Sequence, residues 1–259
     1  TIDNFCKQEA ARGRHIVLDN IIAVVDCARM LQEFSNGDAL LADDIDEEDL
    51  EALLIQQIEF CTTLVLNKVD LVTPEQVAEL KAIVRGLQKD ATIIEAVQGE
   101  VDLDELLNTG KFDFETAYES AAWMEAMEHP EEHEDPEVLE YDITTFVYLR
   151  RRPFTLDKLE AFVRTWPESV IRAKGLAWFQ DDYNMAYVFE QAGRQVHLRE
   201  NGFFVASAPK EDFDKIVASN PEVLDDWDDE VGDRMTKLVF IGRHMDKDAL
   251  VAGLDACLA

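Results

Sequence analysis

The sequence predicts an α/β protein followed by a smaller α+β domain, and three features of the chain predict it. Short apolar runs alternate with amphipathic helical segments up to residue 107, which is typical of a parallel sheet with crossover helices. Residues 125–140 then hold eight acidic residues, two prolines and no lysine or arginine. Strand-like runs dominate the remainder. We therefore expect one domain over residues 1–124, an acidic linker over 125–140 and a second domain over 141–259.

Three apolar runs are the expected strands of the parallel sheet. Residues 19–27 contain five consecutive apolar residues, as in a strand covered on both faces. Residues 62–66 and 91–96 supply the second and third strands. At the carboxyl end of a parallel strand, side chains point into the crevice where α/β proteins bind their ligands.

The segments that alternate with these strands have helical patterns. Residues 73–87 form the best signalled helix, because Thr73 can cap it, Pro74 suits its first turn and Gln76 completes a capping box. Its apolar face comprises Val77, Leu80, Val84 and Leu87. A second helix is expected from apolar spacing at Leu50, Leu53, Leu54, Gln57 and Cys61, and further helices are expected to begin at 102–107 and to cover 115–128.

The second domain is expected to be an antiparallel sheet with helices on one face. Its predicted helices are 155–166, with Leu156, Leu159, Phe162, Val163 and Trp166 inward, and 246–258, with Leu250, Leu254 and Leu258 on one stripe. The pair Asn201-Gly202 is a strong tight-turn signal. The predicted strands are 142–151, 170–179, 184–191, 194–207 and 237–244.

The charge, the apolar runs and the cysteines of the sequence limit the kinds of molecule that the protein is expected to bind. Asp and Glu total 55 against 24 Lys and Arg, a formal net charge of −31, so the surface should repel nucleic acid and anionic membranes and tolerate cations. No apolar run reaches membrane-spanning length. The four cysteines contain no C-x-x-C pair, and Cys27 and Cys61 lie among apolar residues, which indicates core residues and a cytoplasmic protein without disulfides.

The stretch TLVLNKVDLV, residues 63–72, carries the clearest functional pattern, since it joins a buried strand to a capped helix. An ionised Asp70 offers two acceptors in one plane, and guanine presents two adjacent donors, its ring N–H and its exocyclic amine. Adenine lacks that pair of donors and would leave the carboxylate unpaired. Asn67 can bond the far edge of the base and tie neighbouring loops together, and Lys68 can lay its aliphatic stem along the base. The alternative is an ordinary polar strand end.

The chain resembles the CobW-like GTPases, which are P-loop GTPases linked to metal insertion and zinc homeostasis. The resemblance lies in NIIAVVDC, QIEFCTTLVLNKVDLV, FVYLRRRPF, IRAKGLAWF and KLVFIGRHMD, in this order along both domains. It implies the C-terminal part of a P-loop GTPase sheet followed by a CobW C-terminal domain. It also implies that Asn67, Lys68 and Asp70 are the guanine motif, and that Ala96 and Val97 begin the segment that brings backbone N–H groups to the guanine oxygen.

Two motifs that the resemblance calls for are absent from the 259 residues. Neither the phosphate loop G-x-x-x-x-G-K-[ST] nor the metal motif C-x-C-C occurs. We therefore expect Thr1 to lie midway through a GTPase domain, the alternative being a natural relative without a phosphate loop. GTP and Mg²⁺, and zinc or cobalt, would be cofactors of the whole GTPase, and we expect no GTP hydrolysis by this chain alone. The sheet would then have an exposed apolar edge, through which a homo-oligomer could form.

Two further hypotheses concern metals and partners. His129 and His133 are four residues apart among acidic residues, a spacing that could hold a divalent metal on a helix; the alternative is a solvated linker. The basic cluster RRRPF, residues 150–154, is expected to pair with internal carboxylates rather than nucleic acid. The alternative to a metal-chaperone GTPase is a non-enzymatic module whose C-terminal domain docks a metalloprotein client.

Overall fold

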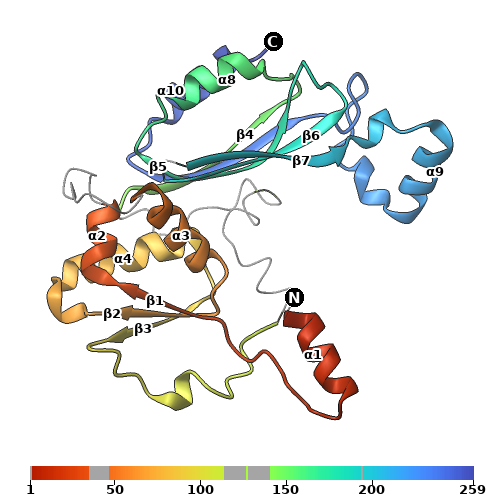
Figure 1. The fold of residues 1–259 in the computed structure, drawn as a ribbon. Coiled ribbons are helices and arrows are strands. Elements are labelled where there is room, and N and C mark those ends of the chain that lie inside the picture. Colours follow the sequence, from red (N-terminus) through yellow and green to blue (C-terminus); the bar gives the residue numbers. More distant parts are fainter. Residues whose placement is uncertain (1, 35–46, 114–126, 128–140, 194) are drawn as a thin grey trace. The chain divides into compact units, whose positions relative to one another are not determined.

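The computed structural model describes residues 2–34, 47–113, 127, 141–193 and 195–259. They fall into two compact units, shown in Figure 1. The N-terminal unit comprises Thr1–Ile45 and Leu53–Glu125, and the C-terminal unit comprises Asp46–Ala52 and Ala126–Ala259. The expected linker over 125–140 and the expected helix over 115–128 lie outside the described residues, Met127 excepted.

The N-terminal unit contains a three-stranded sheet in the order β1-β2-β3. Its strands are β1 (Ile22–Asp26), β2 (Thr63–Asn67) and β3 (Thr92–Ala96). Both strand pairs are parallel, which confirms the fold class that the alternating pattern predicts.

Helices α2 (Cys27–Phe34) and α4 (Pro74–Leu87) lie on one side of this sheet, as does the part of α3 (Glu47–Glu59) from Leu53 onward (Figure 1). Helix α4 begins with the predicted capping box: the Gln76 amide donates to Thr73 Oγ1 at 3.3 Å, and the Thr73 amide donates to Gln76 Oε1 at 2.9 Å. The four residues predicted for its apolar face are all buried. A further helix, α1 (Ile2–Ala11), precedes the sheet.

Three expectations for this unit are wrong. In α3, Ile55 and Ile58 are fully buried whereas Leu53 is 49% exposed, because apolar residues occur nearly all round this helix and spacing alone does not select the inward face. The segment 102–107 forms only a 3₁₀ turn, η2 (Leu103–Glu105). Strand β1 is open on one face, where Val24 is 58% exposed, because alternate side chains project to opposite faces and no described residue covers that side of the edge strand.

Asp19 fastens the segment after η2 to the start of β1. Its carboxylate accepts hydrogen bonds from the amide of Gly110 at 2.6 Å and from the amide of Thr109 at 2.9 Å, and its backbone carbonyl accepts from the Phe112 amide at 2.8 Å. The bond from Gly110 and then that from Thr109 hold the pKa of Asp19 below its ordinary value of 3.8. Because the charged form is the bonded form, the contact is at full strength above the pKa of the unfolded chain.

Replacing Asp19 with Asn should weaken this anchor in a pH-dependent way. A carboxyl group with a depressed pKa in the folded protein contributes stability above its unfolded pKa and loses that contribution as the pH falls through its folded pKa. We expect faster amide hydrogen exchange at Thr109 and Gly110 in the variant at neutral pH, and a shrinking difference from wild type below about pH 4. The exposed Asp104→Asn is the control. Equal exchange in wild type and Asp19→Asn at neutral pH would contradict the assignment.

The C-terminal unit contains a five-stranded antiparallel sheet in the order β4-β8-β5-β6-β7. Helices α8 (Leu156–Val163) and α10 (Lys247–Ala256) lie on one of its faces (Figure 1), as the sequence predicts. The strands are β4 (Ile143–Arg150), β5 (Val170–Trp178), β6 (Met185–Ala192), β7 (Gln195–Phe203) and β8 (Thr236–Arg243).

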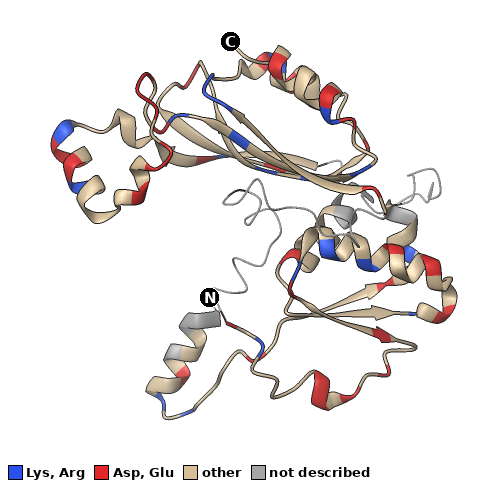
Figure 2. Ribbon diagram, turned by 180° about the vertical axis from the view of Figure 1, so that it is seen from behind, with Lys and Arg blue, Asp and Glu red and all other residues tan. Residues whose placement is uncertain are grey.

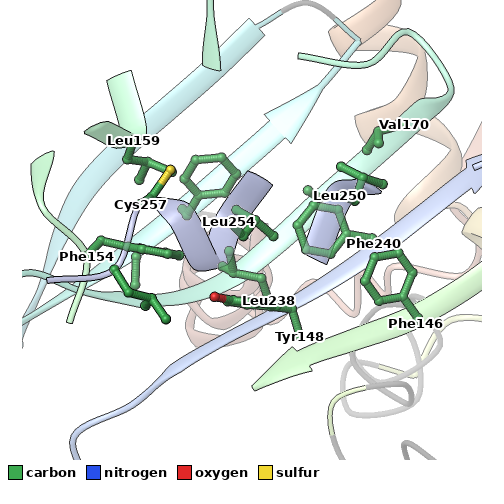
Figure 3. Packing of buried hydrophobic residues seen from close by; sticks show 14 of the residues in the cluster. Phe146, Tyr148, Phe154, Leu159, Val170, Leu238, Phe240, Leu250, Leu254 and Cys257 are labelled. Carbon is green, nitrogen blue, oxygen red and sulfur yellow. The ribbon is translucent and has the colours of Figure 1, made fainter. Parts of the chain in front are cut away.

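The core of this unit lies between the sheet and the two helices. Phe146 of β4 and Phe240 of β8 stack with ring centroids 5.0 Å apart, and both belong to one buried cluster with Leu250 and Leu254 of α10 (Figure 3). Phe240 and Leu254 have no exposed surface. The predicted stripe of leucines on α10 is therefore confirmed, and the sheet and helix form one apolar layer.

Three features of this unit differ from the sequence interpretation. Leu156, expected inward, is 38% exposed at the start of α8. Asn201 and Gly202 do not form a turn but lie within β7, where the pairing with β6 shifts register and leaves Asn201 as an extra residue. Gly202 has φ of 110°, so a glycine there permits a bulge rather than a hairpin. Helix α9 (Lys210–Ser219) was not expected.

Acidic residues are spread along the ribbons of both units (Figure 2). Among the residues that the structure describes, no helix combines the length and apolar character needed to span a membrane.

Candidate functional site

The parallel register brings the carboxyl ends of three strands to the same level. Asp26 at the end of β1 pairs with Asn67 at the end of β2, and Asn67 pairs with Ala96 at the end of β3. Residues far apart in the sequence thus meet along one edge of the sheet, where ligands bind in α/β folds.

The chain turns sharply where β2 ends. Lys68 has a left-handed backbone conformation, with φ of 62° and ψ of 37°, and leads into a 3₁₀ turn, η1 (Val69–Leu71), closed by a bond from the Leu71 amide to the Lys68 carbonyl at 3.0 Å. Asp70 lies in this turn and is exposed. No described residue donates a hydrogen bond to its carboxylate, so the two oxygens are accessible to a ligand.

Asn67 connects this turn to the loop that follows β3. Its Oδ1 accepts a hydrogen bond from the Gly99 amide at 2.9 Å. Gln98 and Gly99 both have left-handed backbones, with φ of 55° and 75°, which curl the loop back toward β2. Val97, at the base of the loop, is 39% exposed. The side chain of Asn67 therefore ties neighbouring loops together, as the sequence suggested.

Asp26, at the end of β1, contacts the side chain of Lys68. Lys68 Nζ donates to Asp26 Oδ2 at 2.5 Å, and the Arg29 amide donates to Asp26 Oδ1 at 3.2 Å. The bond from Lys68, supported by that from Arg29 and opposed by partial burial, lowers the pKa of Asp26 from its usual 3.8. Asp26 therefore stays ionised at neutral pH and fixes the end of the Lys68 side chain.

Two residues at this edge of the sheet have a strained backbone conformation. Five described residues other than glycine have positive φ, and three of them are Asn108, Asp142 and His244, types that tolerate the left-handed region. The remaining two, Lys68 and Gln98, both lie in the loops described above. Each such residue costs of the order of 1–3 kcal/mol, and an exposed ion pair returns only about 0–1 kcal/mol. Strain that stability does not explain is characteristic of functional sites.

The described cysteines and acidic residues do not form a metal site. Cys27 and Cys61 are buried and all four cysteines are free thiols, which confirms that Cys27 and Cys61 are core residues. Burial raises the pKa of the Cys27 thiol to about 11 and that of Cys61 to about 12, so both stay protonated. The described residues contain no group of three or more His, Cys, Asp or Glu side chains that could hold a metal ion. His129 and His133 lie outside the described residues.

The basic cluster at 150–154 is used within the fold. Arg150 binds Asp255 through two bonds, Nε to Oδ1 at 2.7 Å and an Nη to Oδ2 at 2.8 Å, so its pairing with an internal carboxylate is confirmed. Arg151 and Arg152 instead donate to backbone carbonyls, including those of Asp226 and Ala259.

The sequence analysis proposed Asn67, Lys68, Asp70, Ala96 and Val97 for this site but did not include Asp26, which contacts Lys68. The signal was present, because Asp26 ends the first apolar run as Asn67 ends the second. The rule that parallel strands end at one edge would have placed the two residues at the same edge of the sheet, although their contact also depends on strand order and register. The role of Gly99 depends on a loop conformation that spacing does not reveal.

Comparison with known proteins identifies both units. A family model described as the CobW/HypB/UreG nucleotide-binding domain matches residues 2–95, and one described as the cobalamin synthesis protein cobW C-terminal domain matches residues 143–258. This chain belongs to the CobW-like family. Its two family domains occur in the order that the sequence resemblance implied.

The chain is also similar to individual proteins. The chain is 31% identical over 250 residues to the zinc-regulated GTPase metalloprotein activator 1 of Dictyostelium discoideum. The aligned region covers 93% of this chain and 52% of that protein. The chain thus spans about half the length of that relative. Among solved structures, the Zn(II)-bound YjiA GTPase of E. coli aligns with 99% of this chain and 66% of its own, at 17% identity and a TM-score of 0.37.

Proposed function

We propose that this chain supplies guanine recognition to a GTP-binding, metal-chaperone-type GTPase that acts in zinc or cobalt handling. Membership of the CobW-like family supports the proposal, as does the name of the Dictyostelium relative, a zinc-regulated GTPase metalloprotein activator. The whole GTPase would act on a metalloprotein client, to which it would deliver the metal.

The convergence of polar groups at the ends of β1, β2 and β3 carries the proposal. An exposed carboxylate at Asp70, a lysine stem at Lys68 and the loop at Ala96 and Val97 lie on adjacent strand ends. The carboxylate would accept from the ring N–H and the exocyclic amine of guanine, and the loop amides would face its carbonyl oxygen. The lysine stem would cover one face of the base.

The described residues offer no counterpart for the rest of the nucleotide. A phosphate loop would bind the phosphates, and Mg²⁺ would neutralise charge that develops on them. The 259 residues contain no such loop motif, and the described side chains contain no group that could hold a metal ion. We therefore assign no residue to Mg²⁺, zinc or cobalt, and the recognition proposed for this chain concerns the base alone.

A titration with nucleosides tests the proposal on the chain as it stands. Guanosine and adenosine are matched probes because they differ in the base and carry no phosphate, which the acidic surface would repel. We expect guanosine to shift the backbone amide resonances of residues 67–70 and 96–99, and to bind at least about tenfold more tightly than adenosine, since each charge-assisted bond is worth about 1.5–3 kcal/mol. Equal binding of the two nucleosides, or shifts confined to other residues, would contradict the proposal.

A further inference from the structure

We propose that Asp26 is a positioning residue of the guanine site, which holds the Lys68 side chain along the place where the base lies. The inference deepens the proposed function and rests on it. Asp26 touches no part of the base itself and acts through Lys68.

The two carboxylate oxygens of Asp26 have separate tasks. Oδ1 accepts the Arg29 amide at 3.2 Å and so caps the first turn of α2. Oδ2 accepts from Lys68 Nζ at 2.5 Å. The cap fixes the carboxylate to the end of β1, and the carboxylate in turn fixes the lysine ammonium. The lysine head is thereby attached to β1 while its backbone belongs to the end of β2.

This attachment determines the course of the lysine stem. Because Asp26 and Asn67 are register partners on adjacent parallel strands, a side chain that starts at Lys68 and ends at Asp26 runs across the strand ends. A free lysine samples many rotamers and would lose that freedom when a base packs on it. An ion pair that orders the stem beforehand removes this cost from binding.

A contribution to folding stability does not by itself explain the ion pair between Lys68 and Asp26. The Lys68 and Asp26 side chains are 48% and 32% exposed, and pairs of this exposure add little stability. The left-handed backbone of Lys68 opposes folding. The arrangement becomes intelligible if the position of the lysine stem matters for a ligand.

Asp26→Asn separates the two tasks of the side chain. Asparagine keeps an oxygen for the Arg29 amide and is as good a cap as aspartate, but it removes the charge that holds Lys68. The variant should therefore fold. Lys68→Ala and the double variant complete a thermodynamic cycle. Asp212→Asn is the matched control, since it removes one charge from the exposed Asp212–Lys215 pair of α9, in which the charged atoms lie 3.0 Å apart.

The cycle is measured by the dissociation constant for guanosine and by the rate at which Lys68 reacts with an amine-modifying reagent. We expect Asp26→Asn to weaken guanosine binding threefold to tenfold and to speed modification of Lys68 severalfold, with no change in Asp212→Asn. In the Lys68→Ala background, Asp26→Asn should have no further effect on binding.

Unchanged guanosine binding in Asp26→Asn would overturn the inference, and so would an equal loss in the Lys68→Ala background, because Asp26 would then not act through Lys68. In both cases a preference of the wild-type chain for guanosine over adenosine would leave the proposed function intact. If the wild-type chain shows no such preference, the proposed function fails and this inference fails with it.

Discussion

Asp70→Asn should lower the affinity for guanosine by about a hundredfold. The carboxylate would accept two charge-assisted bonds from guanine, and its amide replacement presents a donor where the exocyclic amine also donates, so about 3 kcal/mol is lost. The same replacement suits xanthine, which carries a carbonyl oxygen in place of that amine. The ratio of guanosine to xanthosine affinity should therefore reverse, as measured by nucleoside titration of the backbone amides.

The exposed Asp104 of η2 provides the control for Asp70. Asp104→Asn removes the same charge from the same unit, so it should preserve the preference for guanosine. An Asp70→Asn variant that still prefers guanosine over xanthosine would remove Asp70 from the site, whatever its effect on overall affinity.

Phe240→Ala should destabilise the C-terminal unit by about 3–5 kcal/mol, the range for truncating a buried aromatic residue. Phe240 has no exposed surface and packs on Phe146 and on Trp166, whose ring centroid is 5.9 Å away. Chemical denaturation followed by tryptophan fluorescence would report the loss, since Trp166 lies against the removed ring.

Phe203→Ala is the matched control for this core substitution. Phe203 belongs to the same sheet but is 72% exposed at the end of β7, so its truncation should cost less than about 0.5 kcal/mol. Similar losses in the two variants would show that the sheet face covered by α8 and α10 is not the core of this unit.

The sequence predicts most of the fold because its strongest local signals agree with the tertiary structure. The Thr73 and Gln76 box begins α4 where expected, and alternating runs give three parallel strands. The failures occur where tertiary packing or strand pairing decides between local alternatives. Helix α3 carries apolar side chains on nearly all of its faces, so the burial of Ile55 rather than Leu53 depends on tertiary packing. Asn201-Gly202 favours a tight turn locally, but a glycine with positive φ also permits a bulge, and pairing with β6 selects the bulge.

The candidate site could be predicted only in part, because one of its contacts depends on the pairing of distant strands. Asn67, Lys68 and Asp70 are adjacent in sequence, and their chemistry can be interpreted without coordinates. Asp26 lies 42 residues before Lys68, and its contact depends on strand register. Register arises from long-range pairing, which residue spacing within one segment does not encode.

The bulge in β7 has a consequence for the sheet to which it belongs. Strand β7 is terminal in the order β4-β8-β5-β6-β7, so one row of its backbone groups lacks a neighbouring strand within the sheet, and open edges of this kind promote aggregation by recruiting strands from other molecules. The extra residue at Asn201 interrupts the regular spacing of these backbone groups. The exposed charged residues Arg199 and Glu200 precede it in the strand. An incoming strand could pair with only part of the edge before its hydrogen bonds lost register. The bulge thus limits sheet growth at the edge where the apolar Leu198 and Phe203 are exposed.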